Sequence, residues 1–249
     1  FINPGDLALV PDPGYPVYSI GTAFCGGDTY FMPLEEENAW VPDLDAVPSH
    51  VLKRAKVMWL NYPNNPTGAT VTPLFFERAV DFAKSHDIAL LHDACYSEVT
   101  FDGYRAPSVL QVPGALDVAV EFHSMSKTYN MTGWRIGMAA GNAEMIDALM
   151  RVKSNLDSGT PQAIQEMGIS ALELPESWIS SNNEIYRRRR DMVVDSLKAI
   201  GLDPISPKAG LYVWTNVPEG FSSAQFAQLL LDDRDIVVTP GSGYGRQGE

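Results

Sequence analysis

Residues 57–93 read VMWLNYPNNPTGATVTPLFFERAVDFAKSHDIALLHD, and this stretch decides the fold. It begins and ends with short apolar runs, residues 57–61 and 88–92, that have the length of β-strands. Between them, residues 73–86 form an amphipathic stretch, with Thr72 as the expected N-cap and Pro73 in the first turn. Strands with apolar side chains on both faces are typical of a sheet that helices cover on both sides.

The same alternation continues through the first two thirds of the chain. Further strands are expected at residues 7–10, 29–32, 118–122 and 136–140. Strands that alternate with helices in this way predict an α/β fold with a mainly parallel, doubly wound sheet.

After Ala143 the pattern becomes mostly helical. Helices are expected at residues 143–154, 161–172, 177–200 and 222–231, and strand-like runs lie at residues 211–216 and 236–239. We therefore expect a large domain over residues 1–175, incomplete at its N-terminal end, and a linking helix with a partial, smaller α+β domain over residues 176–249.

The composition suits a cytoplasmic protein without nucleic-acid or membrane partners. A net charge of −13 disfavours binding to nucleic acid or to an anionic membrane, and no apolar run reaches membrane-spanning length. The two cysteines have no metal-ligand spacing, and we expect neither a metal site nor a disulfide framework. The four consecutive arginines, Arg187 to Arg190, are expected to form a solvated helix face with ion pairs to neighbouring carboxylates.

Several polar residues follow the ends of the predicted strands. In an open α/β sheet, ligands bind at the carboxyl ends of the strands, and parallel pairing brings those ends to one edge. The residues are Tyr15, Asn65, Asp93, Tyr96, Ser124, Ser126 and Lys127. A carboxylate, a lysine, hydroxyls and an aromatic ring together resemble the site of a phosphate-bearing aromatic cofactor.

Four motifs make the resemblance specific. Ser124-Met125-Ser126-Lys127, followed by Met131-Thr132-Gly133-Trp134-Arg135-Ile136-Gly137, resembles the lysine motif of class I and II aminotransferases, which use pyridoxal 5'-phosphate (PLP). Three further segments resemble that family's asparagine, aspartate–tyrosine and ring-stacking motifs: Asn61-Tyr62-Pro63-Asn64-Asn65-Pro66-Thr67-Gly68, Asp93-Ala94-Cys95-Tyr96 and Pro11-Asp12-Pro13-Gly14-Tyr15-Pro16. They occur in the family's order, and the resemblance covers nearly the whole chain.

The resemblance implies a role for each residue at the reactive end of PLP. Lys127 would bind the cofactor covalently and then move a proton. Asp93 would pair with the protonated ring nitrogen, and Asn65 and Tyr96 would donate to the phenolic oxygen. The bond between Asn65 and Pro66 would be cis.

The remaining cofactor contacts follow from the same resemblance. Ser124, Ser126 and Arg135 would hold the phosphate. Tyr15 would stack on one face of the ring. Cys95 would cover the other face, where the family most often has alanine.

Other interpretations of these residues stay open at this point. Lys127 could lie on the surface, Asp93 could cap a helix, Asn65 could serve only a turn, and Tyr15 could be a core aromatic residue. A substrate-side role for Asn155 or Ser158 competes with a plain loop, and a supporting role for His92 or His123 competes with simple packing in the core.

The family's glycine-rich phosphate loop, a tyrosine lent by the partner subunit and the arginine that binds the substrate carboxylate have no counterpart here. We therefore expect a longer parent protein, a homodimer, and weak PLP binding by these 249 residues alone.

Within the family, the likeness is strongest to LL-diaminopimelate aminotransferases, which implies transamination between an amino acid and a 2-oxo acid in lysine biosynthesis. A PLP carbon–sulfur lyase of the same fold, and a non-catalytic sensor or fragment, are the alternatives.

Overall fold

The computed structural model describes residues 1–249, and its centre is a sheet of six strands in the order β2-β1-β3-β4-β5-β6. The strands are β1 (Leu7–Asp12), β2 (Asp28–Pro33), β3 (Ala55–Asn61), β4 (Ala89–Asp93), β5 (Ala119–Ser124) and β6 (Gly137–Gly141). Every neighbouring pair is parallel except β5 and β6. The expected mainly parallel sheet is confirmed, and each of the six strands predicted before residue 143 lies within two residues of an observed one.

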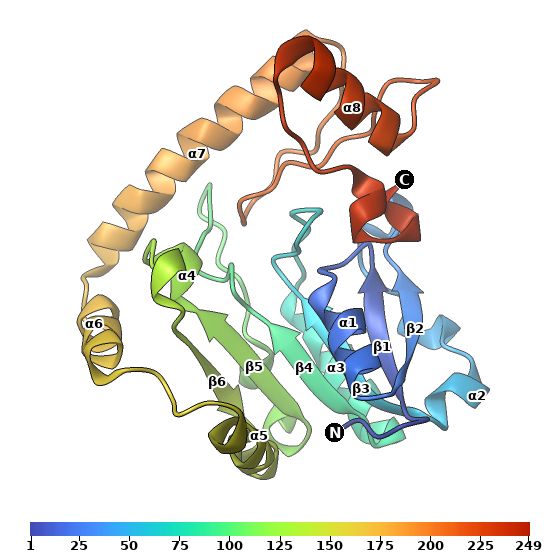
Figure 1. Ribbon diagram of the computed structural model, residues 1–249, viewed down its shortest axis with the longest axis vertical. Coiled ribbons are helices and arrows are strands. Elements are labelled where there is room, and N and C mark those ends of the chain that lie inside the picture. Colours follow the sequence, from blue (N-terminus) through green and yellow to red (C-terminus); the bar gives the residue numbers. More distant parts are fainter.

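Helices cover both faces of this sheet (Figure 1). The helices of the chain are α1 (Val17–Phe24), α2 (Ser49–Leu52), α3 (Pro73–His86), α4 (Met125–Thr128), α5 (Ala143–Leu156), α6 (Gln162–Leu172), α7 (Glu176–Ala199) and α8 (Ser223–Arg234). On β1, Leu7 and Leu9 belong to the apolar cluster that contains α3, whereas Ala8 and Val10 pack in the cluster that contains α1 and borders α5. Alternate residues of one strand therefore serve two helix layers, which confirms the doubly wound arrangement.

The C-terminal residues leave the sheet along α7 and then return to it. Figure 1 shows α7 running beside the sheet to α8, with the carboxyl ends of the parallel strands pointing toward this part of the chain. Residues 208–210 dock on the sheet domain, because the Phe101 amide donates to the Lys208 carbonyl and the Gly210 amide donates to the Val99 carbonyl, both at 2.8 Å. The division at residues 175 and 176 stays a prediction.

Two expected strands of the C-terminal part are wrong. Residues 211–216 and 236–239 pair with no other strand, and the only bridge nearby joins Thr100 to Ala209. A strand needs a hydrogen-bonded neighbour, and these segments instead line an apolar groove of about 480 Å³ beside α7 and α8. Val213, Trp214 and Val238 line that groove, whereas Ile236 and Val237 are exposed.

The expectation of a wholly solvated arginine run also needs correction at Arg190. Arg187 and Arg188 form the expected helix-face pairs with Glu184. Arg190 is buried, and its Nη1 donates to Asp102 at 2.7 Å and to the Pro207 carbonyl at 2.9 Å. Its guanidinium also lies 5.0 Å from the centre of the Phe101 ring. The sequence pattern missed Arg190 because both of its remote partners lie on loops that only the fold brings to α7.

None of the helices combines the length and the apolar composition that crossing a bilayer requires.

Replacing Arg190 with alanine tests its role in holding α7. The substitution Arg190→Ala removes hydrogen bonds to a carboxylate and to a carbonyl, and we expect it to lower the free energy of unfolding by roughly 2–4 kcal/mol. Arg188→Ala is the matched control on the exposed face and should cost less than about 1 kcal/mol. Urea unfolding of both variants measures the difference, and equal losses would contradict this role.

Candidate active site

The chemical motifs meet because three neighbouring strands end together. In the sheet, Asn61 at the end of β3 lies beside Asp93 at the end of β4, and Asp93 lies beside Phe122 near the end of β5. α4 begins directly after β5, and Ser124 caps it by accepting a hydrogen bond from the Ser126 amide at 3.1 Å. Lys127 therefore lies on one short turn at the same sheet edge as the loops that follow β3 and β4.

Lys127 carries an amine with no competing partner. The lysines that form ion pairs are Lys84 and Lys153, and the side chain of Lys127 is half-buried. Its Nζ lies 6.0 Å from the centre of the Tyr96 ring, on the turn that follows Asp93. The amine is thus free to bond a ligand held between these two segments, and the surface-lysine interpretation does not describe this position.

Two donors hold the Asp93 carboxylate. The Tyr18 hydroxyl donates to one oxygen at 2.7 Å, and the Cys95 amide donates to the other at 3.2 Å. Tyr18 itself is buried, and its ring stacks on Trp59 with centroids 4.8 Å apart. The hydrogen bond from the Cys95 backbone N–H is local, as the capping interpretation expected. The hydrogen bond from Tyr18 comes from a distant part of the chain and orients the carboxylate. Tyr18 escaped the sequence analysis, although its position at the start of α1, three residues after Tyr15, was a usable signal.

Asn65 is buried with an incomplete set of hydrogen bonds. Its backbone N–H donates to Asn61 Oδ1 at 2.7 Å, which shapes the turn as expected. The side-chain Oδ1 of Asn65 is buried without a hydrogen-bond partner. Leaving a buried polar atom unpaired costs roughly 1–3 kcal/mol, and a polar ligand at this position would remove that cost. Either the oxygen or the nitrogen of the Asn65 side-chain amide can face the ligand, because a 180° rotation of that amide exchanges the two atoms. The expected cis bond between Asn65 and Pro66 is confirmed.

Tyr96 lies at the wall of the site. It is buried, and its hydroxyl lies 3.1 Å from the hydroxyl of Tyr212. Burial and this hydrogen bond raise the pKa of Tyr96, so its O–H stays protonated and can donate. Burial likewise raises the pKa of the Cys95 thiol, so the residue remains a neutral, compact side chain.

The residues expected at the phosphate and at the ring face are less enclosed. Ser126 is buried, Ser124 is half-buried and Arg135 is exposed. Arg135 Nη1 donates to the Thr132 carbonyl at 3.0 Å, and the neighbouring Ile136 carbonyl accepts from the Met125 amide, which ties this loop to α4. Tyr15 is 42% exposed, which excludes the core-aromatic interpretation and leaves its ring accessible.

A buried carboxylate supports the site from within the sheet. Glu121 on β5 accepts hydrogen bonds from His92 at 2.9 Å, from His123 at 2.8 Å, and from the Ser108 hydroxyl and Val109 amide. His92 also donates from Nε2 to the Tyr62 carbonyl at 3.0 Å, so it connects the asparagine motif to β4 beside Asp93. His92 is fully buried and packs edge to face on Phe76, so the core interpretation describes it, and neither histidine forms a hydrogen bond with Asp93. Glu121 went unnoticed because its partners come from three segments.

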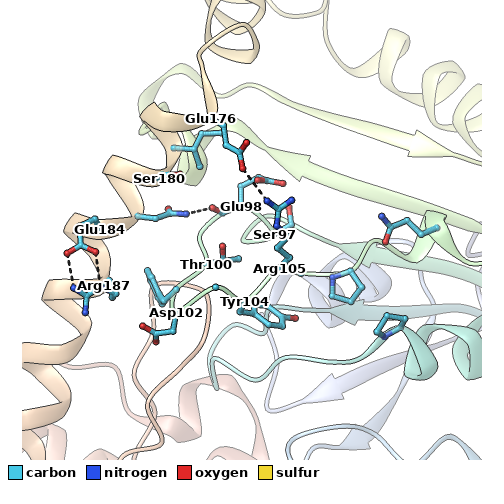
Figure 2. Close-up of a pocket in the computed structure, with 18 residues that line it drawn as sticks. Ser97, Glu98, Thr100, Asp102, Tyr104, Arg105, Glu176, Ser180, Glu184 and Arg187 are labelled. Carbon is cyan, nitrogen blue, oxygen red and sulfur yellow. Dashed lines mark hydrogen bonds and ion pairs between the residues drawn. The ribbon is translucent and has the colours of Figure 1, made fainter.

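A cleft of about 660 Å³ lies elsewhere. Figure 2 shows residues 97–107 facing α7 across it, with Arg105 paired to Glu176 and Arg187 paired to Glu184. These two ion pairs lie within its lining, and none of the motif residues lines it. Asn155 and Ser158 are also exposed, and their substrate-side role stays a prediction.

The residues at the sheet edge fit PLP. An uncommitted amine, an oriented carboxylate, a buried amide without a partner and serine hydroxyls meet there, and these groups match an aldehyde, a ring nitrogen, a phenolic oxygen and a phosphate.

Comparisons with known proteins agree with this chemistry. The family model described as aminotransferase class I and II matches residues 1–248. A protein named LL-diaminopimelate aminotransferase from Dehalococcoides mccartyi is 57% identical over the whole chain, and one of the same name from Aquifex aeolicus is 51% identical. The chain spans 64% of the length of each of these curated relatives.

Solved structures give the same result. The structure of apo-BacF from Bacillus subtilis superimposes with a TM-score of 0.96 at 39% identity, over 99% of this chain and 66% of that one. An aromatic aminotransferase from Pyrococcus horikoshii has a TM-score of 0.93 at 28% identity, over 100% of this chain and 67% of that one.

Removing the charge of Glu121 should weaken the fold in a pH-dependent way. Burial alone would raise the pKa of Glu121, but hydrogen bonds from His123 and His92 outweigh it and hold that pKa well below the ordinary value of 4.5. Glu121→Gln leaves these donors poorly paired, and we expect a loss of roughly 3–5 kcal/mol in the free energy of unfolding at neutral pH.

The sign of the pH dependence follows from the lowered pKa. The contribution of ionised Glu121 is complete above pH 4.5 and is lost as the pH falls below that value, so the gap between wild type and Glu121→Gln should narrow in acid. Denaturant unfolding between neutral and acidic pH measures the gap, with Glu166→Gln as the exposed control. A gap that stays constant into acid would show that the charge of Glu121 is not responsible.

Proposed function

The chain belongs to the class I and II aminotransferase family, and from that premise we propose that it carries the PLP-binding part of an enzyme that moves an amino group between an amino acid and a 2-oxo acid. The observation that carries the proposal is the unpaired amine of Lys127 at the sheet edge that also holds Asp93 and the unsatisfied amide of Asn65.

Lys127 is assigned two tasks. Its amine would hold the cofactor covalently. After substrate has replaced it there, the same amine would move the proton from the substrate α-carbon to the C4′ carbon of the cofactor, and in the reverse direction in the second half of the exchange. The short helix α4 keeps this Nζ near Tyr96, and no carboxylate holds it in place, so the amine can move between these tasks. When bound, PLP supplies an electron sink for the charge that proton removal leaves on the α-carbon.

Asp93 is assigned to the ring nitrogen. Its carboxylate, oriented by Tyr18 and by the Cys95 amide, would keep that nitrogen protonated. Asn65 and Tyr96 would donate to the phenolic oxygen, and Ser124, Ser126 and Arg135 would hold the phosphate. Tyr15 would cover one ring face and Cys95 the other.

The substrate follows from the relatives. Proteins named LL-diaminopimelate aminotransferase are 51–57% identical to this chain, so we propose LL-diaminopimelate and 2-oxoglutarate as the amino acid and 2-oxo acid pair, in lysine biosynthesis. The proposal includes a cytoplasmic homodimer, as the family resemblance implies, with the small-molecule substrates as partners.

Lys127→Ala tests the cofactor assignment in the full-length protein. Wild type should bind PLP with the visible absorbance of a covalent adduct, and the variant should lose that absorbance and at least about 10²–10⁴-fold of its transaminase rate. Lys84→Ala removes a lysine that pairs with Asp117 on the surface and serves as the control. An undiminished adduct in Lys127→Ala would refute the assignment.

A product assay tests the reaction class. With LL-diaminopimelate and 2-oxoglutarate, the full-length protein should form glutamate in step with loss of the 2-oxo acid. With cystathionine it should release no pyruvate or ammonia. Release of pyruvate without amino transfer would indicate a carbon–sulfur lyase instead.

A further inference from the structure

Two tyrosines from distant parts of the chain meet beside the Lys127 amine. Tyr96 lies on the turn after β4, and Tyr212 lies on the segment that follows α7. Their hydroxyl oxygens are 3.1 Å apart, and their rings pack edge to face with centroids 5.7 Å apart. Tyr96 is buried, so its hydroxyl has few alternative partners.

The number of protons gives this contact a direction. A phenolic hydroxyl has one proton to donate and lone pairs with which to accept. In the proposed function, Tyr96 donates its only proton to the phenolic oxygen of the cofactor. Its hydroxyl can then interact with Tyr212 only as an acceptor. Tyr212 has no other hydrogen-bond partner, so its O–H is available to donate.

Three independent contacts place Tyr212 for this purpose. The Gly210 amide donates to the Val99 carbonyl at 2.8 Å, two residues before Tyr212. The Pro207 carbonyl accepts from the buried Arg190 of α7 at 2.9 Å. Gly68 of the asparagine motif, at φ +72°, lies so close that an added Cβ would be 2.8 Å from Pro207 Cβ and 3.3 Å from the Tyr212 carbonyl oxygen. The segment is therefore held against both motif loops.

We propose that Tyr212 is a positioning residue, which donates to the Tyr96 hydroxyl and so directs the Tyr96 proton toward the phenolic oxygen of the cofactor. The inference rests on the proposed function and assigns to it a residue from the C-terminal part of the chain. Donation from Tyr212 also strengthens donation by Tyr96, because hydrogen bonds in a chain polarise one another. The position of residues 207–212 would thereby influence the protonation of the cofactor.

The test is a pH titration of the visible absorbance of PLP bound to the full-length protein. Weaker donation by Tyr96 to the anionic phenolic oxygen makes protonation of the bound cofactor easier. Tyr212→Phe should therefore raise the midpoint of this titration by a few tenths to about one pH unit. Tyr96→Phe should raise it more. In the Tyr96→Phe background the second substitution should have no further effect, because the two hydroxyls act in series.

Tyr186→Phe is the matched control. Tyr186 and Tyr212 both line a pocket of about 250 Å³ beside α7, but Tyr186 donates to Asn130, so loss of its hydroxyl should leave the titration midpoint unchanged. An unshifted midpoint in Tyr212→Phe, or a shift that persists in the Tyr96→Phe background, would overturn the inference. Failure of Tyr212→Phe to fold would overturn it as well, since the hydroxyl would then be structural. Absence of PLP absorbance in wild type would instead refute the proposed function.

Discussion

Parallel pairing of β3, β4 and β5 is the constraint on which the rest of the structure depends. Because these strands run in the same direction in adjacent positions, the residues that follow them converge on one edge of the sheet. Asn65, Asp93 and Lys127 are separated by about thirty residues at each step of the chain, yet they meet there. A one-residue shift of β4 would turn Asp93 to the opposite face and separate it from the amine.

Buried polar groups fix the register of β4 and β5, in addition to apolar packing. Glu121 and His92 face each other across β4 and β5, and the second nitrogen of His92 reaches the Tyr62 carbonyl at the start of the asparagine motif. An unpaired charge at this depth costs several kcal/mol, so registers that separate these partners are strongly disfavoured. The same contacts that stabilise the sheet therefore position the loops that carry the chemistry.

The sequence predicted the parts of the structure that depend on local patterns. Apolar strand runs, the Thr72–Pro73 helix start and the four motifs located the sheet, α3 and the candidate site. It did not predict Tyr18, Glu121, Arg190 or Tyr212, because each has a partner that lies 12 to 116 residues away, and no local spacing connects such partners. It also predicted strands at residues 211–216 and 236–239, since apolar runs that line a groove have the composition of strands.

In the proposed function, the amine of Lys127 binds the cofactor at the sheet edge shared with Asp93. The most direct measurement is borohydride reduction of the PLP-loaded full-length protein, followed by proteolysis and mass spectrometry of the peptides. We expect the reduced cofactor to be attached to the peptide that contains Lys127 and to no other. Attachment to a different lysine, or no attachment in a protein that has bound PLP, would contradict it.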